Sequence, residues 1–143
     1  MTYSSENKVD DIVLVTDDAK EYLNPRQEIT YREHRRELTE WMLGLGKTPE
    51  KAEGYSHSTV KNRMNRLDLF YRFVWDRKGR FVQKLTTDDA DDWMRHLARQ
   101  DMKESTNNHY QKAAKTLFKW KREARNKDVE WKPEIEYSDP STT

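Results

Sequence analysis

The sequence predicts an all-α domain of four main helices, with a short fifth helix near the N-terminus. Three observations lead to this fold class. Apolar residues recur at three- and four-residue steps in four stretches, which is the spacing of one helix face. Residues that cap helices stand at the starts of these stretches. Of the 143 residues, 34% are hydrophobic and 37% are charged, so the core is expected to be small and helical.

The N-terminal residues 1–23 are expected to form a tail that includes the short fifth helix. Thr16 is followed by Asp17 and Asp18, and carboxylates stabilise the first turn of a helix. This helix is predicted to end near Leu23.

Residues 24–133 are expected to form the helical body. Side-chain oxygens available to cap helices mark four starts, at Asn24, Ser58-Thr59, Thr86 and Ser105-Thr106. Gly79 predicts a left-handed end for the second of these helices. Trp131 and Pro133 are expected to dock back on the body, and residues 134–143 are predicted to be a disordered tail or a linker.

The stretch from residue 56 to residue 79 has an apolar stripe along its whole length, but its other face changes along the chain. Near the start this face carries Lys61, Asn62 and Asn65, whereas near the end it carries Leu69 and Phe73. We therefore expect the C-terminal half of this helix to be buried almost all round. The N-terminal half is expected to present a polar, basic surface suited to a groove of nucleic acid.

Charge is unevenly distributed, although the net charge is only +1. Residues 57–84 hold eight basic and two acidic side chains, and residues 102–132 hold nine and four. Between them, residues 85–101 hold two basic and five acidic side chains. Two basic blocks indicate a partner with negative charge, such as nucleic acid.

The last predicted helix carries a stripe of one charge sign on the face opposite its apolar residues. Its members are Asn108, Lys112, Lys115, Lys119 and Arg122. A solvated face normally mixes signs, because opposite charges three or four residues apart stabilise a helix. This stripe has no carboxylate, which favours contact with nucleic acid over an ordinary solvated face. The helix at residues 58–79 adds Ser58, Lys61, Asn62, Asn65 and Arg66 as candidate contacts.

Several other chemistries are excluded or disfavoured. The chain has no cysteine, which excludes disulfides and thiolate metal sites and fits the cytoplasm. The four histidines show no zinc-binding spacing, and the aspartates at residues 88–92 are explained by a helix start. No apolar run has the length of a membrane span. We expect no cofactor, no metal and no membrane contact.

Several short patterns together resemble a known family. They are Tyr22-Leu23, Ser58-Thr59-Val60, Leu67-x-x-Phe70, the run from Leu85 to Ala90, Leu97, and Ser105-Thr106 opening a helix that reaches Trp120. Over residues 20–133 the chain resembles the N-terminal core-binding, SAM-like domain of tyrosine recombinases, the integrases of phages and archaeal elements, especially haloarchaeal ones. The resemblance implies two crossed helical hairpins that close half of a clamp on duplex DNA. It also implies DNA contacts at Ser58, Thr59, Asn62, Ser105, Asn107 and Asn108.

The function expected from these observations is binding of double-stranded DNA as the core-binding part of a site-specific recombinase. The chain is not expected to be an enzyme, because the resemblance does not extend to the family's catalytic domain. His96-x-x-Arg99 matches a catalytic string of that family, but it lies in the non-catalytic part. We expect a monomer in free solution and contacts with other integrase protomers on DNA.

Two alternatives stay open. A free-standing chain of this kind could regulate recombination without cutting DNA. It could also be a helical module that binds proteins, in which case the apolar side chains of its helices would be exposed. Exposure of Leu69, Phe73 and Trp120 distinguishes the protein-binding alternative from DNA binding.

Overall fold

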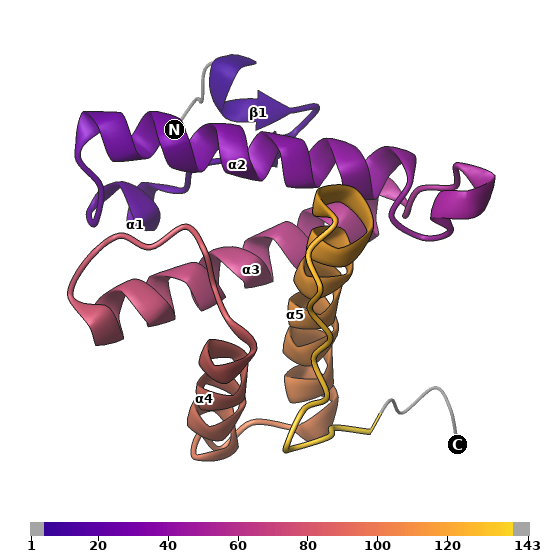
Figure 1. Ribbon diagram of the computed structural model, residues 1–143. Coiled ribbons are helices and arrows are strands. Elements are labelled where there is room, and N and C mark those ends of the chain that lie inside the picture. Colours follow the sequence, from indigo (N-terminus) through magenta and orange to yellow (C-terminus); the bar gives the residue numbers. More distant parts are fainter. Residues whose placement is uncertain (1–4, 139–143) are drawn as a thin grey trace.

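The computed structural model describes residues 5–138 and consists of two helical hairpins that cross each other (Figure 1). The first hairpin is formed by α2 (Pro25–Gly44) and α3 (His57–Lys78). The second is formed by α4 (Thr87–Ala98) and α5 (Glu104–Arg125). The predicted all-α class and the crossed hairpins are confirmed, and α1 (Asp17–Lys20) is the short fifth helix.

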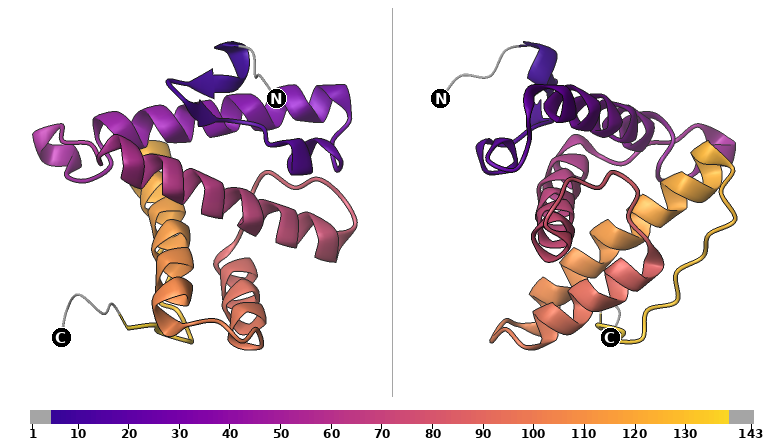
Figure 2. Two further views of the ribbon diagram at one scale, coloured as in Figure 1. Left: turned by 180° about the vertical axis from the view of Figure 1, so that it is seen from behind. Right: turned by 60° about the vertical axis from the view of Figure 1, so that its left-hand side comes forward.

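A small β-hairpin near the N-terminus was not predicted. After a 3-10 turn at Ser5–Asn7, β1 (Lys8–Val9) pairs antiparallel with β2 (Ile12–Val13). It lies on α2, on the side away from the α4–α5 hairpin (Figures 1 and 2). A second 3-10 turn, at Pro49–Lys51, lies in the loop between α2 and α3.

The segment predicted as an N-terminal tail packs on the body from Asn7 onward. Ile12, Leu14 and Val15 are fully buried. The segment is held by Arg35 of α2, a buried side chain whose Nε donates to the Leu14 carbonyl at 2.7 Å. Its Nη1 donates to the Met64 carbonyl at 2.6 Å, so one guanidinium joins the N-terminal segment to α2 and α3. Carbonyl acceptors make burial of this charge tolerable.

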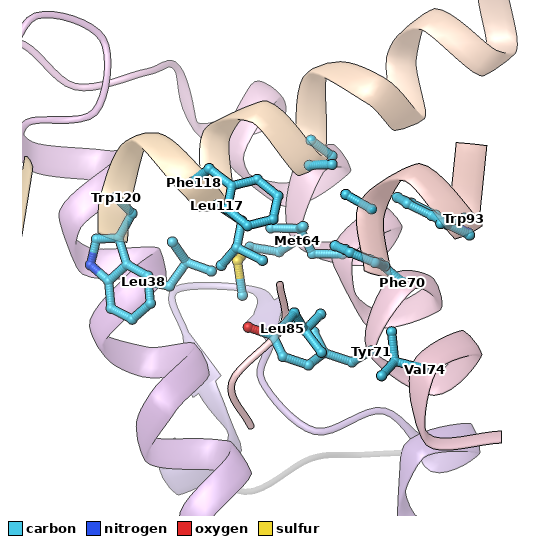
Figure 3. Packing of buried hydrophobic residues seen from close by; sticks show 14 of the residues in the cluster. Leu38, Met64, Phe70, Tyr71, Val74, Leu85, Trp93, Leu117, Phe118 and Trp120 are labelled. Carbon is cyan, nitrogen blue, oxygen red and sulfur yellow. The ribbon is translucent and has the colours of Figure 1, made fainter. Parts of the chain in front are cut away.

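The core lies where the two hairpins cross, and α3 runs through its centre (Figure 3). Phe70 of α3 stacks on Trp93 of α4, with 4.6 Å between ring centroids. Met64 and Leu117 bring α3 against α5. Each large apolar side chain buried in this way contributes about 1.5–3 kcal/mol. The core is therefore small but rich in aromatic rings.

Most of the predicted helix boundaries are confirmed by their caps. Thr16, Asn24 and Thr86 each accept a hydrogen bond from a backbone amide in the first turn. Gly79 ends α3 with φ of +69°, a conformation that favours glycine.

Two other predicted caps are wrong. The cap of α3 is Ser56, two residues before the expected Ser58. The helix α5 begins at Glu104 after Lys103, which makes no side-chain cap, so Ser105 and Thr106 lie inside its first turn.

The C-terminal half of α3 is less buried than expected. Leu69 is 38% exposed and Phe73 is half-buried, because both face a groove beside α4 that Tyr22 and Tyr110 also line. By contrast, Trp120 is only 3% exposed. The partial exposure of Leu69 and Phe73 therefore favours the protein-binding alternative, whereas the burial of Trp120 favours DNA binding.

The segment after α5 folds back along that helix (Figure 1). Trp131 is buried against Phe118, with 5.7 Å between ring centroids, as the sequence predicts for a docked side chain. Residues 134–138, expected in a disordered tail, also pack on α5, because its side-chain amides bind their backbone. Residues 139–143 of that predicted tail lie outside the described residues.

Candidate nucleic-acid interface

The start of α3 and the first half of α5 meet in a polar hollow, which we call the basic hollow. It is lined by Thr59, Asn62, Arg63, Arg66, His109 and Lys112. The first four residues come from α3 and the last two from α5. Because α3 packs directly on α5, side chains 43 or more positions apart in the sequence share one surface.

Local structure explains how α3 presents its four residues. Ser56 Oγ accepts from the Thr59 backbone amide at 3.3 Å, which starts the helix at His57. From this start, steps of three and four residues place Thr59, Asn62, Arg63 and Arg66 on one face. Val60 and Met64 point the other way and are fully buried. The core therefore fixes the orientation of the polar face.

Arg63 of the basic hollow is held by two side-chain contacts. Its Nη1 donates to Thr116 Oγ1 at 3.1 Å, and its guanidinium carbon lies 4.4 Å from the centre of the Tyr55 ring. Both contacts leave other N–H groups of the guanidinium available. Within the described residues, Asn62 and Arg66 make no hydrogen bond or ion pair at their side chains.

The basic hollow has a one-sided charge. Arg63, Arg66 and Lys112 carry positive charge, and among the described residues no carboxylate lines the hollow. A concave surface with cations on two helices attracts polyanions and can hold phosphate oxygens by charge-assisted hydrogen bonds. Amide and hydroxyl groups at Asn62 and Thr59 add neutral donors and acceptors.

Several cations predicted as DNA contacts are bound by other parts of the chain. Lys61 lies 3.0 Å from Asp11 of the β1–β2 turn, and this hydrogen bond lowers the pKa of the Asp11 carboxyl. Lys119 Nζ donates to the backbone carbonyls of Gly46 and Lys47, at 2.7 and 3.2 Å. These two lysines tie loops to α3 and α5 and lie outside the lining of the basic hollow.

Two other predicted cations of α5 contact the C-terminal segment. Lys115 forms an ion pair with Glu136 at 3.3 Å. Arg122 lies 3.9 Å from Glu123 and donates to the Val129 carbonyl at 3.4 Å. The stripe predicted on α5 thus divides between the basic hollow, which contains Lys112, and the region beside the C-terminal segment.

Two predicted contacts do not lie on a solvent face. Asn107 and Asn108 are 4% and 6% exposed, so the placement of Asn108 on an open face is wrong. The reason is tertiary, because Asn108 Nδ2 donates to the Tyr137 carbonyl at 2.9 Å beneath the C-terminal segment. Ser105 is half-buried, whereas Ser58 and Asn65 are exposed on α3.

Sequence reasoning did not select Arg63 or His109 as members of the site. Arg63 could have been found, because it completes the three- and four-residue spacing from Thr59 to Arg66. His109 precedes Lys112 by three residues, but no pattern in α5 distinguishes it from other exposed positions.

A separate pocket at the C-terminal end of α5 also contains cations. It is lined by His34, Gln83, Lys84, Trp120, Lys121, Arg125 and Lys127. Burial, followed by the charge of Arg125, lowers the pKa of His34 to about 3, so the imidazole is neutral. Burial and the neighbouring Lys84 lower the pKa of Lys121 to about 8. Cations at this end also favourably oppose the helix dipole, which accounts for them without a ligand.

Two further features bear on the site. Among the residues that the structure describes, no group of three or more His, Asp or Glu side chains is arranged to hold a metal ion. In the same part of the chain, no helix combines the length and apolar character needed to cross a membrane.

The fold places this chain among compact all-α domains of two crossed helical hairpins. Its residues 47–125 match the N-terminal SAM-like domain of phage integrase, and the chain belongs to that family. The match includes all of α3, α4 and α5, and with them every residue that lines the basic hollow. No curated protein and no solved structure shows significant similarity to the chain.

Proposed function

We propose that the chain binds duplex DNA as the core-binding part of a site-specific recombinase, and that the basic hollow contacts the phosphate backbone. The observation that carries this proposal is the convergence of three cations from α3 and α5 on a hollow in which no described residue contributes a carboxylate. Membership of the integrase SAM-like family supports it, because phage integrases act on DNA. On this proposal the chain positions DNA and does not cut it.

Titration of a fluorescent duplex at several salt concentrations tests the proposal. Release of counterions gives a slope of log K against log[salt] of about −0.9 for each phosphate contacted. Three lining cations therefore predict a slope of about −3, and each further lysine that reaches a phosphate makes it steeper. A slope near zero contradicts the proposal.

A matched pair of variants locates the interface. Arg66→Gln is expected to weaken binding and to make the salt slope shallower by about one unit. Arg26→Gln, at an exposed position in the first turn of α2, is expected to leave both the affinity and the slope unchanged. Both variants remove one positive charge, so equal losses would show a general charge effect instead of a contact at the basic hollow.

The groove between α3 and α4 favours a second candidate function, a protein-binding surface. Leu69 and Phe73 lie in this groove with Tyr22 and Tyr110, so an apolar partner would find exposed rings and a leucine. Leu69→Ser is expected to leave DNA titration unchanged if DNA binding is the function of the basic hollow. If the titration shows no binding of DNA, this groove is the better-supported functional site.

A further inference from the structure

The C-terminal segment of residues 128–138, which we call the strap, runs antiparallel along α5 (Figures 1 and 2). Its first contact is with Arg122 near the end of the helix, through the Val129 carbonyl. Its last contacts are near the start of the helix, where the backbone amide of Ser138 donates to Glu104 at 3.0 Å. The strap therefore covers one side of α5 along most of its length.

Side-chain amides of α5 hold the backbone of the strap. Gln111 Nε2 donates to the Ile135 carbonyl at 2.6 Å, and its Oε1 accepts from the Tyr137 amide at 3.0 Å. Asn108 Nδ2 donates to the Tyr137 carbonyl at 2.9 Å. These amides could otherwise contact bases or phosphates, so the strap occupies donors and acceptors that suit nucleic acid.

The fit beneath the strap is incomplete. Oδ1 of Asn107 and Oδ1 of Asn108 are buried, and no described residue donates a hydrogen bond to either atom. An acceptor buried without a donor is unfavourable, and native proteins contain few of them. The docked strap thus binds the Asn108 amide at Nδ2 but leaves its Oδ1 without a donor among the described residues, so this contact satisfies the side chain only in part.

The strap has a net negative charge, so it can compete with DNA for the cations of α5. It carries four carboxylates, at Asp128, Glu130, Glu134 and Glu136, and one cation, Lys132. Glu136 pairs with Lys115 at 3.3 Å, and Glu130 lines a hollow together with Lys115, Lys119 and Arg122. Carboxylates stand beside the α5 cations at the positions where phosphates would be attracted.

We propose that the strap is an autoinhibitory element that covers the amides of Asn108 and Gln111 and neutralises Lys115, and that duplex DNA displaces it when it engages α5. This inference rests on the proposed DNA-binding function. The apparent dissociation constant of such a protein equals the intrinsic constant divided by the fraction of molecules in which the strap is undocked.

Hydrogen exchange of the full chain, with and without a short duplex, tests displacement directly. The amides of Tyr137 and Ser138 are bonded to α5 side chains, so exchange over residues 128–138 is expected to accelerate when DNA is added. Exchange in the buried part of α2 serves as the internal control and is expected to stay slow. Binding of DNA with unchanged protection of residues 128–138 overturns the inference while leaving the proposed function intact.

Two variants measure the inhibition without relying on one another. Trp131→Ala removes the buried anchor of the strap, and Glu136→Gln removes one exposed carboxylate. Each is expected to tighten DNA binding, by about tenfold for Trp131→Ala if the strap is docked in nine of ten molecules. Melting curves report whether the Trp131→Ala variant is folded. If it is not folded, Glu136→Gln still tests the inference, because this exposed substitution is not expected to unfold the domain.

Glu21→Gln is the matched control for charge, because it also removes an exposed carboxylate but lies at the end of α1. It is expected to change DNA affinity less than Glu136→Gln. Equal gains for the two variants, together with no gain for a folded Trp131→Ala, overturn the inference. Failure of every variant to bind DNA would instead contradict the proposed function itself.

Discussion

The hydroxyl of Tyr31 in α2 lies 2.7 Å from a carboxylate oxygen of Asp68 in α3, and both side chains are buried. The other oxygen of Asp68 accepts from Thr16 at 2.7 Å and from Arg72 at 3.0 Å. One carboxylate therefore joins the start of α1 to both helices of the first hairpin. Burial, with Asp68 alongside, raises the pKa of Tyr31 well above its usual range, so the phenol stays protonated and donates.

Asp68→Asn is expected to destabilise the domain by about 3 kcal/mol, because it leaves Arg72 without its buried partner and replaces an acceptor by a donor. Urea unfolding measures the change. Asp76→Asn, exposed on the same helix, is expected to change stability by less than about 0.5 kcal/mol. Similar values for the two variants would contradict the role assigned to Asp68.

Stability is expected to fall as the pH is lowered below about 6.5, in part through His34. In the unfolded chain this imidazole has its ordinary pKa of about 6.5. In the folded chain its pKa is about 3, because it is buried and close to Arg125. Between these values the unfolded chain binds one more proton, so acid favours unfolding by about 1.4 kcal/mol per pH unit.

Unfolding free energies measured between pH 7 and pH 4 check this prediction. His34→Gln is expected to show a shallower pH dependence than the original chain, whereas His109→Gln, with an exposed imidazole, is expected to keep it. Identical slopes for the original chain and His34→Gln would contradict the prediction.

Gly54 is required by close packing in the loop between α2 and α3. A Cβ atom at this position would lie 1.7 Å from the Leu43 carbonyl oxygen, a backbone atom that cannot move aside cheaply. Gly54→Ala is expected to cost about 2 kcal/mol or more and to weaken DNA binding, since this loop carries Tyr55 beneath Arg63.

Gly44→Ala provides the contrast, measured by thermal unfolding. Gly44 is the last residue of α2, and an added Cβ would meet nothing within 4 Å. Alanine there is expected to leave stability unchanged or to raise it by up to about 1 kcal/mol. A larger loss for Gly44→Ala than for Gly54→Ala would show that the loop does not pack as described.

Asp11 is expected to weaken DNA binding in the original chain, because it pairs with Lys61 at the start of α3. Asp11→Asn should raise affinity about threefold, which lies within the range for an exposed ion pair, and make the salt slope steeper. Asp76→Asn adds the same net charge at the other end of α3 and is expected to have a smaller effect. Anisotropy titrations at two salt concentrations separate the two outcomes.

Asn62 is expected to contribute sequence preference instead of general affinity. Its exposed amide makes no hydrogen bond within the described residues and can donate to and accept from one base edge. Selection from a randomised duplex pool is expected to enrich a preferred site with the original chain. Asn62→Ala should narrow the gap between that site and random DNA by about 1–3 kcal/mol. Equal weakening on both DNAs would assign Asn62 to the phosphate backbone.

Local interactions explain why much of the secondary structure was predictable. Thr16, Asn24 and Thr86 cap amides only three residues away, and Gly79 ends α3 through its own backbone conformation. Such contacts depend on neighbouring residues and leave a direct mark in the sequence. The helical spacing of apolar residues likewise predicted which face of each long helix is buried.

The composition of the candidate site was decided by contacts between distant residues. Arg63 meets Thr116 53 positions away, Lys61 meets Asp11 across 50, and Asn108 is buried by Tyr137 across 29. No local pattern records these pairings, because they arise only when the hairpins cross and the strap folds back. The sequence alone therefore determined the helices, their apolar faces and the basic character of α3 and α5. Tertiary packing decided which polar side chains face solvent, since neighbours from elsewhere in the chain cover or pair the others.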